Sequence, residues 1–393
     1  MCAHTVRSGR LCRNDRGSET LCRNAIVLDA TRGVPEGFVV RERHAAPGQR
    51  EAMMDVLSEV LRVIRLSGVV HLRAEFTQPF AIAASHDNLA ARFNVPGESP
   101  IAFHVFVSGS CLVSTDRLRP TRIEAGDVIV FPRGEAHVLA SDPGLSPVRM
   151  REIYTAPSTE RVSVVKHGGG GESAHLVCGF LYSDHKFSPL FESLPAVLCV
   201  RNGALTLETL DETAPRAQPI ARPQEADWWQ ASVRYLISEA AAPGPGNRAA
   251  LARLAESLFV EVLRWQFRHA AGDHGGWLAG LHDPQVGRVL SLIHALPDRP
   301  WTVDGLANEA AMSRAALAKR FVELVGQSPI HYLAGWRMHL AQNLLRESTL
   351  GVGEIAGRVG YESEAAFNRA FRRLVGAPPA TWRQAKANGV NAS

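Results

Sequence analysis

A pattern of apolar and small residues occurs twice near the C-terminal end of the chain, and this repeat constrains the fold more than any other feature. Residues 306–312 match residues 355–361 at an offset of 49. From Ser313 onward the offset is 50, and it holds as far as the match of Tyr332 with Trp382. About nine matched positions at nearly constant spacing exceed chance, so the segment is an internal duplication.

Each copy has the sequence pattern of a helix-turn-helix. In the first copy we predict a short helix over residues 303–310, a tight turn at Ala311-Met312 and a second helix with Ser313 as its N-cap. Gly326 follows that second helix, where glycine commonly ends a helix. The second copy repeats these features with a helix over 352–359, the turn Gly360-Tyr361, the N-cap Ser363 and the helix end Gly376.

The second helix of each copy places its apolar residues on one side and small, amide or basic residues on the other. We take these outer positions, with the cap of the second copy, as the DNA-binding candidates: Arg314, Ala315, Ala318, Lys319, Ser363, Glu364, Ala365, Asn368, Arg369, Arg372 and Arg373. Such a face suits the major groove, where Asn reads adenine and Lys or Arg reads guanine. Because the first copy has alanines at two of these positions, we expect the second to make more polar base contacts.

The distribution of charge agrees with a nucleic-acid partner at this end. Residues 286–393 contain 13 Lys and Arg against 8 Asp and Glu, whereas the rest of the chain contains 30 against 31. A basic end on a neutral body favours a polyanion, here double-stranded DNA. A spacer helix over 330–345, about 24 Å long, would let one monomer touch two successive major grooves. The alternative is a helical interaction module that does not contact DNA.

The rest of the chain divides into an extension, a strand-rich segment and a helical segment. Residues 1–53 lack periodicity, and we expect them to be disordered or to result from a misassigned start. Short apolar runs separated by Gly, Pro and Asp predict a β-sandwich or barrel over 54–200. We expect residues 201–283 to form a helical connector that could mediate dimerisation. Residues 284–385 are predicted to be entirely helical, and residues 386–393 to form a disordered tail. The fold class is therefore α+β.

The strand-rich segment resembles a cupin barrel. The resemblance rests on the motif Gly126-Asp127-x-x-x-x-Pro132-x-Gly134-x-x-His137, which matches the second cupin motif. In addition, His104 lies where the first cupin motif has a histidine. The second histidine of that motif is absent, and no Glu follows at the usual distance, which weakens an enzymatic interpretation. Two alternatives stay open: His104, His137 and Cys178 hold zinc, or the histidines line the barrel without a metal.

The C-terminal segment resembles the AraC/XylS family of transcription regulators. The resemblance covers residues 284–385 and includes Gly360-Tyr361-x-Ser363 and Phe371-Arg372-Arg373-x-x-Gly376-x-x-Pro379. It implies a sequence-specific regulator, here taken as an activator, with a cupin-like effector domain and with RNA polymerase as a partner. The alternative function is that of a metal-dependent cupin enzyme fused to a DNA-binding module. Of the two, we expect the regulator, without enzymatic activity.

The signal is expected in the cupin-like domain, as a small-molecule effector or an oxidant. Some members of this family respond to oxidants through a cysteine, which makes Cys111 and Cys178 candidates beside His104 and His137. The six cysteines form no paired motif, and no apolar segment follows the arginine-rich N-terminus. We therefore expect no structural disulfides, no membrane partner, a cytoplasmic location and a homodimer formed through residues 228–268 or the barrel.

Overall fold

The computed structural model of the chain describes residues 47–64, 66–85, 100–154, 162–183, 189–202, 206–210, 216–219, 222–242, 244–269 and 276–390. Most of the extension expected over 1–53 lies outside these ranges. Helix α1 (Pro47–Ile64) begins before residue 54, and helix α14 (Pro379–Val390) continues past residue 385. No helix within the described ranges is long and apolar enough to cross a membrane.

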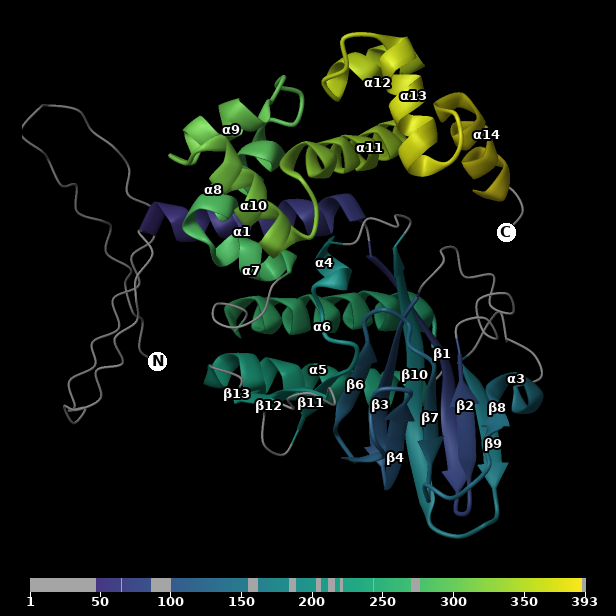
Figure 1. Cartoon of the computed structure of the whole chain (residues 1–393). Helices are drawn as coiled ribbons and strands as arrows, with labels where there is room; N and C mark the ends of the chain where they lie inside the picture. The colour runs from purple at the N-terminus through teal and green to yellow at the C-terminus, as the bar shows by residue number, and fades with distance from the viewer. Residues whose placement is uncertain are drawn as a thin grey trace, which may run out of the picture. The chain divides into compact units, whose positions relative to one another are not determined.

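The strand-rich segment forms two sheets that enclose a hydrophobic core (Figure 1). The larger sheet has eight strands, in the order β13 (Arg216–Pro219), β12 (Thr206–Thr209), β11 (Leu198–Arg201), β6 (Val128–Phe131), β3 (Ile101–Ser108), β10 (Ser173–Ser183), β1 (Leu66–Thr77) and β9 (Ser163–Gly168). The smaller has five, in the order β5 (Thr121–Glu124), β4 (Ser110–Thr115), β7 (His137–Ala140), β2 (Ala81–Ala84) and β8 (Val148–Arg149). The expected barrel is thus built as two sheets, and the described strands do not close it.

The larger sheet is buried on both faces, and strand β3 shows why. Its residues alternate between the two faces, as a strand requires. Ala102 and Phe106 join the core between the sheets, whereas Phe103 and Val105 join a second cluster with helices α5 (Pro223–Ala241) and α6 (Asn247–His269). Trp229 of α5 and Phe259 of α6 belong to that second cluster. Such two-sided burial produces the nearly continuous apolar run of this strand.

The boundary expected at residue 200 does not separate the sheet from the helices. Strands β12 and β13 extend the larger sheet to residue 219, inside the segment expected to be helical. Helices α5 and α6 have the predicted positions, but they contact the sheet rather than bridge two domains. Sequence patterns missed β12 and β13 because four-residue strands are too short for a clear alternation.

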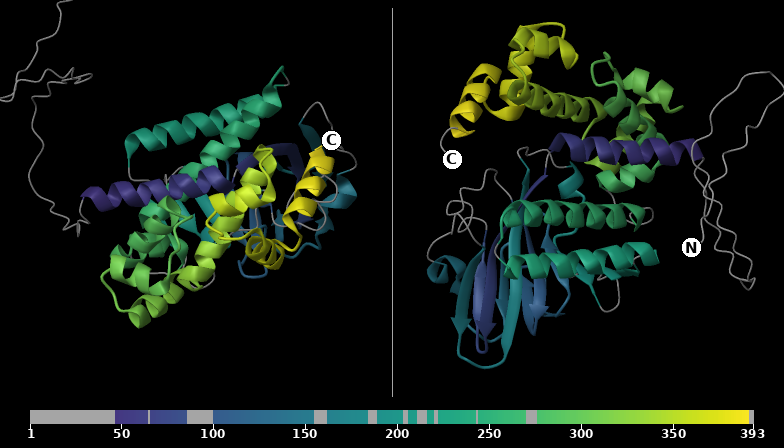
Figure 2. Two further views of the ribbon diagram at one scale, coloured as in Figure 1. Left: turned by 90° about the horizontal axis from the view of Figure 1, so that it is seen from above. Right: turned by 180° about the vertical axis from the view of Figure 1, so that it is seen from behind.

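The C-terminal segment is all helical, as predicted. Its helices are α7 (Trp277–His282), α8 (Pro284–Ala295), α9 (Val303–Glu309), α10 (Arg314–Val325), α11 (Pro329–Glu347), α12 (Val352–Arg358), α13 (Glu364–Val375) and α14. The pairs α9–α10 and α12–α13 are the two predicted helix-turn-helix units, and α11 is the predicted spacer between them (Figure 1 and Figure 2). The second unit has its own core around Phe367 and Phe371.

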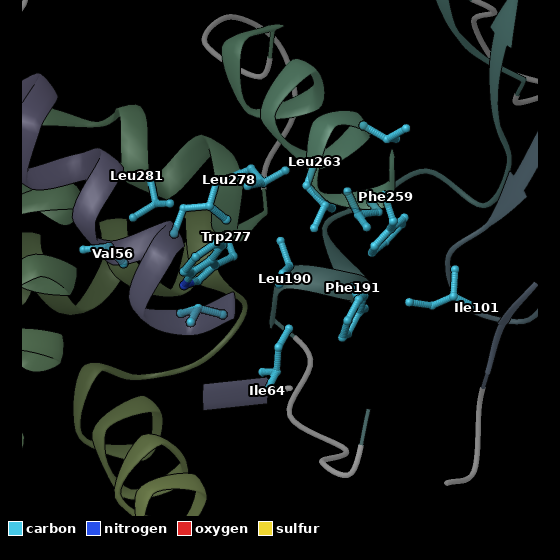
Figure 3. Close-up of a cluster of buried hydrophobic side chains, with 14 of the residues drawn as sticks. Val56, Ile64, Ile101, Leu190, Phe191, Phe259, Leu263, Trp277, Leu278 and Leu281 are labelled. Atoms are coloured by element: carbon cyan, nitrogen blue, oxygen red, sulfur yellow. The ribbon is translucent and has the colours of Figure 1, made fainter. Parts of the chain in front are cut away.

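A hydrophobic cluster connects helices that lie far apart in the sequence (Figure 3). Val56 and Ile64 of α1 belong to it together with Phe191 of the short helix α4 (Pro189–Glu192), Leu263 of α6 and Trp277 of α7. Helix α1 also contacts α8 and α11, and the Asn343 amide donates to the carbonyl of Val63 at 3.1 Å. A helix that precedes the first strand therefore packs against the unit that carries the first recognition helix.

The turn in the first helix-turn-helix unit predicts a stabilising substitution. Ala311 has a φ of 52°, and the matching residue of the second unit is Gly360, with a φ of 84°. Side chains make this left-handed conformation unfavourable, so Ala311→Gly should raise the free energy of unfolding by about 0.5–1 kcal/mol. Ala318→Gly, in the middle of α10, is the control and should lower it by a similar amount. Urea unfolding measures the free energy of unfolding of both variants. A lower free energy of unfolding for Ala311→Gly would contradict backbone strain at Ala311.

Candidate DNA-binding surface and sensor pocket

Both recognition helices, α10 and α13, begin and end as predicted. The Ser313 hydroxyl accepts a hydrogen bond from the Ala316 amide at 3.2 Å, and the Ser363 hydroxyl accepts one from Ala366 at 3.3 Å. These caps satisfy amides that would otherwise lack partners at the start of a helix. Gly326 and Gly376 end the helices in the left-handed conformation. The loop before α13 has one residue more than the loop before α10, which explains the change of offset from 49 to 50.

The predicted outer face of α10 is exposed, but its basic residues already lie beside carboxylates. Arg314, Ala315 and Lys319 are exposed and Ala318 is half-buried. The Arg314 guanidinium lies 3.3 Å from a carboxylate oxygen of Asp304, and the Lys319 ammonium lies 3.9 Å from Glu323. Exposed pairs of this kind contribute little to stability, so both cations remain available to a phosphate or a base.

The outer face of α13 offers more polar groups with fewer partners. Ser363, Glu364, Ala365, Arg369, Arg372 and Arg373 are exposed, and Asn368 is half-buried. The guanidinium groups of Arg369 and Arg372 have no hydrogen-bond or ion-pair partner within the described ranges. Phe367 and Phe371 are fully buried on the opposite side of the helix. That the second unit makes more of the polar base contacts than the first stays a prediction.

Residues outside both recognition helices hold the units in place, and the sequence did not reveal them. Trp277 donates through its indole N–H to the Tyr332 hydroxyl at 2.7 Å, and that hydroxyl donates to His294 Nε2 at 2.6 Å. Burial lowers the pKa of His294 to about 3, which keeps the ring neutral and able to accept this bond. Arg337 of α11 donates to the carbonyls of Pro297 and Arg299.

The two candidate histidines of the strand-rich domain contact each other directly. His104 of β3 and His137 of β7 are both buried, and their Nε2 atoms lie 2.8 Å apart. His137 Nδ1 lies 2.9 Å from the carbonyl oxygen of Glu135, and its ring stacks on Phe131 with a centroid distance of 3.9 Å. Burial lowers the pKa of His137 to about 4 and that of His104 well below its usual range. The pair is therefore neutral at physiological pH.

The third candidate of this domain, Cys178, lies opposite His104 in the β10–β3 pairing. A pocket of about 30 Å³ opens beside all three side chains. Its lining is mostly apolar and includes Leu72, Ala102, Met150, Cys178, Glu135 and the two histidines. Sequence reasoning missed Glu135, although it lies within the motif that identified His137. The structure thus brings His104, His137 and Cys178 to one cavity.

The cysteines are free thiols in the interior. Cys111, Cys178 and Cys199 are buried and form no disulfide. Burial raises the pKa of the Cys111 thiol to about 12, and it raises those of Cys178 and Cys199 further above the usual range. A thiol with a raised pKa is a weak nucleophile, because the thiolate is the reactive form. Burial therefore disfavours the reactive thiolate form of all three groups.

The His104–His137 pair does not fit a zinc ion in this arrangement. Two imidazole nitrogens that bind one tetrahedral zinc lie roughly 3.3 Å apart, since each Zn–N bond is about 2.0–2.1 Å. The 2.8 Å separation observed is that of a hydrogen bond. In the described part of the chain no three His, Cys, Asp or Glu side chains are grouped to hold a metal ion.

Two family models match the chain, one for each part of the fold. The model described as a cupin matches residues 55–217 and 207–268, and the model described as a helix-turn-helix domain matches residues 306–385. The cupin match extends through α5 and almost to the end of α6. It therefore includes most of the segment that the sequence patterns had separated as a connector.

Relatives match across both parts. An AraC-like transcription regulator of Streptomyces lividans is 31% identical over 334 residues, which cover 84% of this chain and 98% of the relative. The transcriptional regulator AlkR of Acinetobacter baylyi is 26% identical over 84% of this chain and 99% of its own length. The activator RclR of Escherichia coli is 26% identical over 73% of this chain and 85% of its own. The chain therefore belongs to the AraC family of transcription regulators and carries an N-terminal cupin domain.

Proposed function

We propose that the chain regulates transcription by reading DNA with the outer faces of α10 and α13, under the control of an effector bound in the cupin domain. The observation that carries the first part is the exposure of two capped recognition helices on either side of α11. Helix α11 has 19 residues and is about 28 Å long, which suits two successive major grooves. The relatives whose match includes the cupin domain are named as transcription regulators, and we therefore propose a regulator rather than an enzyme.

Within this function, polar base contacts come mainly from Asn368 and Arg369 of α13, whereas α10 contributes Arg314, Lys319 and apolar contacts from its alanines. Arg372 and Arg373, one turn further along α13, suit phosphates. The side chains present support this division. Asn368 and Arg369 can each hydrogen-bond to the edge of a base, whereas Ala315 and Ala318 of α10 cannot.

The unequal units make a prediction for operator binding. Arg369→Ala should cost about 1–3 kcal/mol on a fragment selected from random DNA, and it should relax the base preference at one position. Lys319→Ala should cost less and leave the preference unchanged. Arg253→Ala, at an exposed pair on α6, controls for loss of charge. Fluorescence anisotropy over a salt series measures these affinities, and equal losses for Arg369→Ala and Lys319→Ala would contradict unequal units.

For the signal, the pocket beside His104 and His137 favours a bound effector over oxidation of a thiol. The relative RclR is named as an RCS-specific activator, and the alternative signal expected for this chain is an oxidant. However, Cys111 and Cys178 are buried thiols with raised pKa values, and a sensing cysteine needs an accessible thiolate. A pocket with unpartnered polar atoms is the feature that a reversible ligand uses.

Thiol labelling separates these two signals. In a protein with Cys2, Cys12 and Cys22 replaced by serine, a maleimide should label the three buried cysteines roughly a hundredfold more slowly than in the same protein unfolded by urea. Mass spectrometry of peptides assigns the rate to each cysteine. Labelling of Cys178 at the rate of an unfolded thiol would instead favour the oxidant.

We further propose a homodimer formed through the exposed side of α5. Trp228 is 40% exposed and Tyr235 is 52% exposed, and they lie seven residues apart on one face of the helix. If two copies of α5 cross antiparallel at Ala231, Trp228 faces Arg234 of the other copy and Tyr235 faces Asp227 of the other copy. A cation–π contact and a hydroxyl–carboxylate hydrogen bond then form twice, as a two-fold interface requires.

The dimer proposal predicts the effect of one added charge. Tyr235→Asp should bring a second carboxylate close to Asp227 of the other copy and shift the protein to monomer in sedimentation velocity at micromolar concentration. Val164→Asp is the control, because Val164 is a similarly exposed apolar residue on β9. A monomeric wild type, or a Tyr235→Asp protein that remains dimeric, would contradict the interface.

One further partner, RNA polymerase, follows from the proposed role. The relative RclR is named as an activator, which supports activation by contact with RNA polymerase. A cytoplasmic location is part of the same proposal, because the protein would act on chromosomal DNA.

A further inference from the structure

The hydrogen bonds of the histidine pair determine which ring nitrogens carry protons. A carbonyl oxygen only accepts, so His137 Nδ1 must donate to the carbonyl of Glu135. A neutral imidazole has one N–H, so His137 Nε2 is then an acceptor. The 2.8 Å contact with His104 requires a donor, and His104 Nε2 supplies it. The second nitrogen of His104, Nδ1, is therefore a bare acceptor.

This acceptor has no partner within the described part of the chain, and neither does a second one at the same pocket. His104 Nδ1 and Glu135 Oε2 are both buried atoms without a hydrogen bond. The other oxygen of the Glu135 carboxylate already accepts from Arg133 Nε at 2.9 Å. His104 itself is only 5% exposed. A buried acceptor left without a donor costs about 1–3 kcal/mol, which a ligand with a donor would recover.

The rest of the pocket restricts the ligand in size and charge. Its volume of about 30 Å³ suits roughly two or three water-sized groups, so the buried part of a ligand is short. The lining around Leu72, Ala102 and Met150 is apolar and favours a hydrocarbon portion. A negative ligand would meet the Glu135 carboxylate and two neutral rings. Among the described residues that line the pocket there is no Lys or Arg, and the neighbouring Arg133 is already paired with Glu135. A positive ligand would lose its hydration in an apolar pocket.

We propose that the effector of this protein is a small neutral alcohol, whose hydroxyl donates to His104 Nδ1 beside Glu135 Oε2. This inference rests on the proposed effector pocket and specifies its ligand class. The discriminating feature is the direction of the hydrogen bond at these two atoms: His104 Nδ1 and Glu135 Oε2 are acceptors and need a donor. An ether of the same size and shape has an oxygen but no donor, so it should be rejected.

The tautomers are tested first, without any ligand. Long-range nitrogen–proton spectra of the histidine rings in the full chain distinguish a protonated ring nitrogen from a bare one. We expect His137 to carry its proton on Nδ1 and His104 on Nε2. The opposite tautomer of His104 would carry its proton on Nδ1. That nitrogen would then donate a hydrogen bond to the ligand instead of accepting one, which would overturn the proposal.

The ligand class is tested with two isomers and an anion. We would titrate 1-butanol, diethyl ether and butyrate into the full chain and follow the amide signals of Leu72, Cys178 and Gly179, which line the pocket. Binding of 1-butanol should be roughly tenfold tighter than that of its isomer diethyl ether, and butyrate should be weakest. Equal affinities for the two isomers, or tighter binding of butyrate, would overturn the proposal but leave the effector pocket in place.

Variants assign the preference to the histidines. His104→Phe/His137→Phe removes every ring acceptor at similar volume, so the two isomers should then bind with equal affinity. His167→Phe/His175→Phe, on β9 and β10 outside the pocket lining, is the matched control and should keep the tenfold preference. If the first variant does not fold, the tautomer spectra of the wild type still decide. Binding of none of the three probes would refute both the alcohol and the pocket, while operator binding would be unaffected.

Discussion

The buried contact of Tyr332 with Trp277 and His294 fixes the start of α11, and both recognition helices take their positions from α11. The first unit packs against this end of the helix, since Phe321 of α10 meets the Tyr332 ring edge-on. Helices α12 and α13 of the second unit contact α11 as well, and Arg383 of α14 donates to the carbonyl of Leu345 at the far end of α11 at 2.9 Å. Removal of the Tyr332 hydroxyl, as in Tyr332→Phe, would leave the Trp277 indole N–H and His294 Nε2 without this partner in a closely packed interior, which would lower the stability of the fold.

Sequence patterns predicted those features of the fold that depend on neighbours along the chain. The caps Ser313 and Ser363, the glycine helix ends and the extra residue before α13 are local, and the repeat exposed them by comparison. The strand that carries His104 was also predicted, because its apolar run is continuous. Strands β12 and β13 were missed, since four residues contain too little pattern, and their place in the sheet comes from pairing with β11.

The candidate site was predictable in its residue types but not in its chemistry. The motif spacing identified His137, and the first cupin motif identified His104. Their direct hydrogen bond could not be predicted, because it depends on the approach of β3 and β7 from different sheets. Zinc and thiol oxidation were reasonable expectations for His and Cys side chains. The 2.8 Å contact between the two rings is too short for a shared zinc ion, and burial disfavours the thiolate that oxidation requires. The same strand β3 also places Phe103 and Val105 in the cluster that contains Trp277.

The central claim is that one monomer reads two successive major grooves, with the second helix-turn-helix unit making most of the polar base contacts. Missing-base interference on a selected operator tests it most directly. The account predicts two patches of interference within each half-site, about 10 base pairs apart and on one face of the duplex, with the stronger patch weakened by Arg369→Ala. A single patch per half-site, or two patches that Arg369→Ala leaves unchanged, would contradict it.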